Sequence, residues 1–149
     1  MSDLETIRKL RLICGASIGL CHKALDESGG DFDRALEILK KQGAEVAEKK
    51  SQRITKSGLI GVYVHSDQKL GSLIEVRTET DFVARNPEFK AFVHDLAMQV
   101  AASEVKNVEE LLDQPFIKDQ SKTIGDYVKE NISKFGENIE VARFYKMSL

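Results

Sequence analysis

The spacing of the apolar residues changes partway along this 149-residue chain, and the change constrains the fold more than any other feature. Up to Gly43 the apolar residues recur every three or four positions, which is typical of helices that bury one side. From Leu59 onward the sequence is rich in Val, Ile and Tyr, and the polar turn Ser66 to Gln68 separates two such runs. The chain is therefore expected to form a helical part followed by a part that contains a β-hairpin.

Three short helices are predicted in the first part. The first ends near Gly15, the second ends at Ser28 to Gly30, and the third begins after the N-cap candidate Asp31 and ends at Gly43. The residues expected to face inward are Leu4, Ile7, Leu10, Ile13, Ile18, Cys21, Ala24, Leu25, Phe32, Ala35, Leu36 and Leu39. A bundle this small has little core of its own, so it is expected to act as an adaptor that contacts another macromolecule.

The second part combines the hairpin with helices and a last strand. Asn86 is an N-cap candidate, Pro87 follows at the first helical position, and the apolar residues of this helix have regular helical spacing. They are Phe89, Phe92, Val93, Leu96 and Val100. A connecting segment holding Leu111, Leu112, Pro115 and Phe116, a shorter helix from Thr123 to Lys134 and a strand over residues 138–147 complete this part. The predicted class is α+β, with an antiparallel sheet packed against helices.

These patterns suggest a domain boundary on each side of a charged stretch. We expect a helical module over residues 1–44, a linker over residues 45–57 and an α+β domain over residues 58–149. The linker contains more Lys and Arg than Glu, so it is either a solvated helical connection or a phosphate-binding patch.

Composition and cysteine content exclude several classes of protein. The formal net charge is -2, which gives no overall positive field for binding duplex nucleic acid. No run approaches the roughly 20 apolar residues of a membrane-spanning helix, and the N-terminus has no apolar signal core, so a cytoplasmic location is expected. Cys14 and Cys21 are seven positions apart, which fits buried thiols better than a disulfide or a zinc site.

The sequence contains no recognisable catalytic motif. Phosphate-binding loops, dinucleotide fingerprints, nucleophile elbows and metalloprotease motifs are all missing. Glu75, Glu79 and Asp81 could be imagined as paired carboxylates, but no matching His or Lys lies near them in the sequence. We therefore expect no enzyme activity, no cofactor and no metal; a small metal-dependent hydrolase is the enzyme alternative, and it lacks ligands.

The segment Thr80 to Val83 raises the question of what covers Phe82. Burying a phenylalanine side chain is worth roughly 1.5 to 3 kcal/mol, so some surface is expected to cover the ring. That surface is either the protein's own core, which base rates favour, or a partner, with Asp81 as the polar half of the contact.

Several motifs together resemble the bacterial translation elongation factor Ts family in its short form. The sequence TDFVARN, from Thr80 to Asn86, looks like the signature of that family. Residues 15–43 resemble its N-terminal three-helix module, which is similar to the UBA fold, and residues 71–103 resemble its core. The closing segments LLDQPFIKDQSKTIGDYVKENI and FGENIEVARF also match, so the likeness covers nearly the whole chain.

The resemblance implies a guanine nucleotide exchange factor. Such a protein binds the GDP form of the GTPase elongation factor Tu and accelerates loss of GDP. Thr80, Asp81, Phe82 and Val83 would then contact the partner near its magnesium and phosphate site. By position, Gln99 matches another core residue that touches the partner, and Arg11 and Ile18 match residues of the small module that bind it elsewhere.

The chain departs from the family pattern at three points. Gly19 stands where the family usually has an anchoring methionine, and Thr78 stands where it usually has a cysteine. The chain also holds a single copy of the core that longer members duplicate, so the resemblance implies a homodimer that uses the C-terminal strand around Val141 to Met147. Two other readings remain: an adaptor without exchange activity, and an RNA-binding protein that uses the basic linker and Phe82 as a stacking platform.

Overall fold

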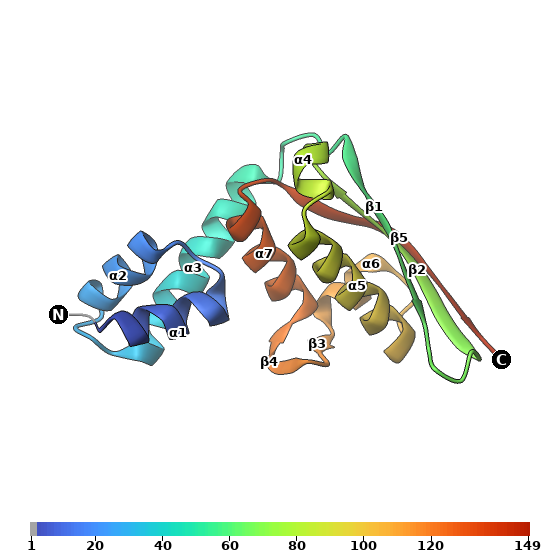
Figure 1. The fold of residues 1–149 in the computed structure, drawn as a ribbon, viewed down its shortest axis with the longest axis horizontal. Helices are drawn as coiled ribbons and strands as arrows, with labels where there is room; N and C mark the ends of the chain where they lie inside the picture. Colours follow the sequence, from blue (N-terminus) through green and yellow to red (C-terminus); the bar gives the residue numbers. More distant parts are fainter. Residues whose placement is uncertain (1–2) are drawn as a thin grey trace. The chain divides into compact units, whose positions relative to one another are not determined.

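The computed structural model describes residues 3–149 and shows the expected α+β class (Figure 1). The chain divides into two compact units. One comprises the residues up to Gln52 together with Lys129–Gly136, and the other comprises Arg53–Val128 and Glu137–Leu149. Within the described residues, no helix is both long enough and apolar enough to span a bilayer.

Three helices form most of the first unit, as the sequence predicts. They are α1 (Leu4–Cys14), α2 (Ile18–Glu27) and α3 (Phe32–Lys50). The N-cap side chains Asp3, Ser17 and Asp31 each accept a hydrogen bond from a backbone N–H in the first turn. The core of this unit consists of Ile7, Leu10, Cys14, Ala16, Cys21, Ala24, Leu25, Ala35 and Leu39.

Three residues expected to face inward are exposed instead. Leu4, Ile13 and Ile18 are 69%, 40% and 54% exposed. The stripe predicted on the first helix used a strict spacing of three, and each such step falls about 60° short of a full helical turn. Its two ends therefore leave the buried face, and Cys14 takes the inward position that was assigned to Ile13.

The third helix also continues past its predicted end at Gly43 and stops at Lys50. A glycine inside a helix costs only about 1 kcal/mol relative to alanine, and the residues after it are good helix formers. Ala47 is buried on this extension, so packing supports the added turns.

Both cysteines are free and buried, as predicted. Burial raises the pKa of the Cys21 thiol to about 11, and the neighbouring Cys14 adds to the rise. The thiolate of Cys21 is therefore scarce at neutral pH.

The second unit is built on a three-stranded antiparallel sheet in the order β1-β2-β5. Its strands are β1 (Ser57–Val64), β2 (Leu70–Thr78) and β5 (Ile139–Ser148). The turn between β1 and β2 confirms the predicted hairpin. The last strand of the chain pairs with β2, so β2 is the central strand and β5 lies at an edge.

Helix α5 (Pro87–Ala102) packs against β1 and β2 (Figure 1). All five apolar residues predicted to face inward are buried, with at most 1% of their surface exposed. Gly61 of β1 allows this close approach, because a Cβ atom there would collide with the side chain of Val93. One face of the sheet is thereby covered.

The segment predicted to be a plain connection contains regular structure. It forms α6 (Val108–Asp113), β3 (Pro115–Phe116) and β4 (Asp119–Thr123), and α7 (Ile124–Phe135) follows almost as predicted. Phe116 is buried and stacks on the ring of Tyr127 with a centroid distance of 4.3 Å. Packing of Phe116 on Tyr127 thus orders the β3–β4 hairpin. The strands of this hairpin are too short and polar to give a recognisable strand pattern in the sequence.

Candidate functional site

A helix of only four residues, α4 (Asp81–Ala84), carries the segment singled out in the sequence. It follows β2 almost directly, and Thr80 is its N-cap residue. Val83 and Ala84 are buried beneath the helix, whereas Asp81 and Phe82 lie on its outer side and are exposed. The short helix thus has an anchoring pair and a presenting pair.

Phe82 is 85% exposed, so the protein's own core does not cover its ring. Together with Asp81, Arg85, Asn86 and Pro87 it lines a hollow on the surface of this unit. Leaving so large an apolar side chain in water forgoes roughly 1.5 to 3 kcal/mol of burial free energy. Of the two surfaces considered for covering this ring, the core is excluded.

Asp81 contacts residues on both sides of it in the sequence. The hydroxyl of Ser57, the first residue of β1, donates a hydrogen bond to its carboxylate. The guanidinium of Arg85 lies 4.0 Å from its other oxygen, and both side chains of that pair are largely exposed. The carboxylate is therefore oriented and still accessible to a partner.

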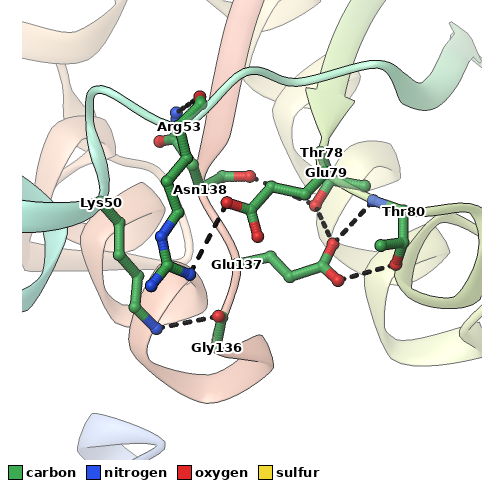
Figure 2. A network of polar contacts seen from close by, with 8 residues as sticks. All are labelled: Lys50, Arg53, Thr78, Glu79, Thr80, Gly136, Glu137 and Asn138. Atoms are coloured by element: carbon green, nitrogen blue, oxygen red, sulfur yellow. Dashed lines mark hydrogen bonds and ion pairs between the residues drawn. The ribbon is translucent and has the colours of Figure 1, made fainter.

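Thr80 is held by a residue that the sequence analysis did not single out. Glu137 Oε1 accepts the backbone N–H of Thr80 at 3.0 Å, and Glu137 Oε2 accepts the Thr80 hydroxyl at 2.7 Å (Figure 2). Because Glu137 lies 57 positions further along the chain, no local pattern could have indicated this contact. Ser57 was missed for the same reason, since its hydroxyl meets Asp81 across 24 positions.

The remaining predicted site residues lie elsewhere. Gln99 belongs to α5 and is only 1% exposed. Its side chain bonds to three neighbours, donating to Pro115 O at 3.1 Å and Ser103 Oγ at 3.2 Å and accepting from Ile117 N at 3.0 Å. In this structure Gln99 therefore fixes the β3–β4 hairpin to α5.

Arg11 and Ile18 belong to the first unit, and both are exposed. Arg11 lies in the last turn of α1 and Ile18 opens α2. Their neighbours Leu12 and Leu20 are also exposed, at 86% and 42%, so this unit leaves several aliphatic side chains in solvent. Aliphatic side chains left in solvent are available for contact with another protein.

Residues 3–149 contain no group of three or more His, Cys, Asp and Glu side chains placed to hold a metal ion. The carboxylates near α4 are instead paired with hydroxyls, backbone N–H groups and arginines, as Glu137 is with Thr80 and Glu79 is with Arg53 at 3.7 Å. What α4 presents at its surface is an exposed ring and an oriented acid.

The family model and the relatives that match this chain carry the same name. A family model described as Elongation factor TS matches residues 79–149, a range that begins just before α4. A protein from Clostridium kluyveri named Elongation factor Ts is 43% identical over 149 residues, which is all of this chain and 49% of the relative. This chain thus spans about half the length of that relative.

Relatives of the same name that this chain covers more fully come from Geotalea uraniireducens and Thermotoga petrophila. The first is 37% identical over 188 residues, covering 96% of this chain and 87% of the relative. The second is 38% identical over 190 residues, covering 99% of this chain and 96% of the relative. Because these alignments are longer than the 149 residues of this chain, both relatives contain inserted residues that it lacks.

Proposed function

Because the chain belongs to the elongation factor Ts family, we propose that it binds elongation factor Tu in its GDP-bound form and accelerates the release of GDP, so that GTP can enter. The observation that carries the proposal is the exposed Phe82 beside an oriented Asp81 on α4. An exchange factor acts on a nucleotide held by its partner. It needs a surface that deforms the partner and no bond chemistry of its own, so we propose that this chain is not an enzyme.

In this proposal, α4 enters the nucleotide domain of the partner. Phe82 inserts between partner helices, where burial of its ring replaces its exposure to water. Asp81 disturbs the polar groups that support the hydrated Mg²⁺ of the partner, an ion that tolerates little distortion of its octahedral shell. Weaker binding of Mg²⁺ leaves the phosphates of GDP facing carboxylates without compensation, and GDP then dissociates. Thr80 and Val83 hold the two presenting residues in place from either side.

Burial of the Phe82 ring alone cannot account for a large acceleration of GDP release. Each tenfold change in rate requires 1.36 kcal/mol, so a thousandfold acceleration requires about 4 kcal/mol. Burial of one phenyl ring provides roughly 1.5 to 3 kcal/mol. Other contacts must therefore favour the nucleotide-free complex over the GDP complex, because equal affinity for both shifts neither population.

We propose that the module over residues 1–44 provides the additional contacts through Arg11 and Ile18, joined to the 58–149 domain by residues 45–57. The exposed aliphatic residues of the first unit support this role. The part that Gln99 plays in partner binding stays a prediction, and its burial favours an effect through the β3–β4 hairpin that it holds. In this reading the protein works in the cytoplasm and contacts no nucleic acid directly.

We also propose that the chain forms a homodimer. The face of the sheet that α5 does not cover presents exposed apolar side chains, namely Ile60, Val62, Val64, Leu73, Tyr145 and Met147. The strand register brings Val62, Leu73 and Tyr145 into line across the sheet. A second copy that covers this face and the edge strand β5 would bury them. Light scattering at high concentration is expected to give twice the chain mass, and a monomeric mass would contradict the dimer.

The test of the exchange function is the release of a fluorescent GDP analogue from elongation factor Tu, followed by stopped flow. The wild-type protein is expected to accelerate release. A variant carrying Asp81→Ala and Phe82→Ala is expected to remain folded and to lose most of that acceleration. No acceleration by the wild-type protein would exclude exchange activity and favour an adaptor role for the helical module.

A further inference from the structure

The entry to α4 is held from a distant part of the chain by one side chain. Both carboxylate oxygens of Glu137 are used: Oε2 accepts the Thr80 hydroxyl, and Oε1 accepts the Thr80 N–H and the Thr78 hydroxyl at 3.1 Å (Figure 2). Hydrogen bonds to a charged acceptor are roughly twice as strong as neutral ones. Glu137 is therefore placed to fix both the backbone and the side chain of the residue that begins α4.

From a distant position in the same chain, Glu137 provides the hydrogen bond that a neighbouring residue provides in a capping box. In a capping box the residue three positions after the N-cap is Glu, Gln or Asp, and its side chain accepts the N–H of the N-cap residue. For α7 the local form is present, because Thr123 Oγ1 accepts Asp126 N and Asp126 Oδ2 accepts Thr123 N, each at 3.1 Å. In α4 the corresponding position is Val83, a buried aliphatic residue that anchors the helix and has no acceptor in its side chain. Glu137 supplies the acceptor for the Thr80 N–H that the side chain of Val83 lacks.

A helix of four residues depends on such help. Helix formation in water has an unfavourable nucleus, and a single turn does not persist by itself. The local cap is weak, since the Val83 N–H lies 3.5 Å from Thr80 Oγ1. The direction in which Phe82 points therefore depends on the contacts that hold Thr80.

The position of Glu137 is itself well supported. Gly136 has a φ of 72°, a left-handed conformation that ends α7. The next residue, Asn138, is 3% exposed and donates from Nδ2 to Arg53 O at 2.9 Å. Thr78 is fully buried and also contacts Asn138 O at 3.2 Å. The carboxylate thus extends from a fixed backbone toward an exposed segment.

We propose that Glu137 is a positioning residue for the exchange reaction, acting through Thr80 to hold α4 so that Phe82 and Asp81 are presented ready for the partner. The inference rests on the proposed exchange function and deepens it by adding a residue that does not itself touch the nucleotide site. A rigid presenting segment lowers the entropy that binding must overcome. Glu137 therefore raises the efficiency of exchange without contacting the partner's nucleotide.

The first test measures local order without any partner. Amide hydrogen exchange is compared for the wild type, Glu137→Ala, Glu137→Gln and the matched control Glu110→Ala. In the control a glutamate that accepts a backbone N–H, that of Lys106 at 2.8 Å, is removed at the start of another short helix, α6. Glu137→Ala is expected to speed exchange about tenfold over residues 80–85, while exchange in α5 stays unchanged. Glu137→Gln keeps one acceptor oxygen and is expected to retain most of the protection.

The second test measures GDP release from elongation factor Tu with the same variants and with Glu137→Ala combined with Phe82→Ala. Glu137→Ala is expected to slow release about tenfold, Glu137→Gln to restore most of it, and Glu110→Ala to change it less than twofold. If Glu137 acts through Phe82, removing Glu137 has little further effect once Phe82 is gone. An equal loss in both backgrounds would overturn the proposal.

Two other results are equally decisive. Unchanged hydrogen exchange over residues 80–85 in Glu137→Ala, or faster exchange throughout the chain, would show that Glu137 does not act on α4 specifically. A wild-type protein that fails to accelerate GDP release would remove the exchange role of Glu137 together with the proposed function. In that case the hydrogen-exchange comparison alone decides whether Glu137 orders α4.

Discussion

Two consecutive helices, α4 and α5, use phenylalanine in opposite ways. Phe89 and Phe92 of α5 are 0% and 1% exposed, whereas Phe82 of α4 is 85% exposed. Helix α5 is long enough to lay a continuous apolar face on the sheet, so its aromatic rings complete the core. In helix α4, Val83 anchors the helix and the side chain of Phe82 remains in solvent. The contrast teaches that an aromatic residue the fold does not need is available for binding.

The largest effect expected from this contrast is on stability. Phe89→Ala is expected to lower the free energy of unfolding by about 3 to 5 kcal/mol, because it removes a fully buried ring and leaves a cavity. Phe82→Ala is expected to change it by less than about 0.5 kcal/mol, as is usual for exposed sites. Urea unfolding followed by circular dichroism measures both. A destabilised Phe82→Ala variant would break the comparison, because the ring would then belong to the core.

A smaller effect is expected from the two N-caps. Asn86 Oδ1 accepts the N–H of Glu88 at 2.9 Å at the start of α5, and Asn86→Ala is expected to cost about 1 kcal/mol of unfolding free energy. GDP release should slow less than it does with Thr80→Ala, because Asn86 caps a helix that packs in the core. Thr80→Ala is expected to show the reverse, with nearly unchanged unfolding and clearly slower release. Urea unfolding and stopped-flow release on both variants would separate a supporting helix from a presenting one; equal effects would argue against the distinction.

The smallest effect is expected from the surface pair beside Phe82. Arg85 Nη2 and Asp81 Oδ2 are 4.0 Å apart, and both side chains are mostly in solvent. Such pairs contribute about 0 to 1 kcal/mol, so Arg85→Ala should shift stability by no more than about 0.5 kcal/mol. Thermal unfolding at low and high salt should give nearly the same difference. A larger loss would mean that polar contacts, and not Val83, anchor α4.

The same two helices show what can be predicted from sequence. The apolar period of α5 and its cap at Asn86 indicated the helix and its buried face correctly, because one long periodic segment carries that information locally. The exposure of Phe82 was not decided by any local pattern. It depends on how α4 leaves β2 and on Glu137, which arrives from 57 positions away. Resemblance to a family pointed to the segment, and only the structure showed how it is held.

Other differences between the prediction and the structure also have identifiable physical causes. Glycine often ends helices, so the sequence predicts that α3 ends at Gly43, but burial of Ala47 outweighs the small cost of a glycine inside the helix. A spacing of three predicts that Leu4 and Ile13 are buried, but residues at that spacing drift around the helix, and both side chains are exposed. The hairpin of β3 and β4 was missed because its order comes from contacts such as Phe116 on Tyr127.

The sheet is completed by the last strand of the chain, so during synthesis β2 has to wait for β5. At about 5 to 20 residues per second, the 57 positions that separate Thr80 from Glu137 take roughly 3 to 11 s to translate. During that interval the nascent segment around Phe82 has neither β5 beside β2 nor the carboxylate that fixes Thr80. The newly made chain therefore exposes one unpaired edge of β2 and an unsupported aromatic residue for seconds, a period in which protection by a chaperone would matter most.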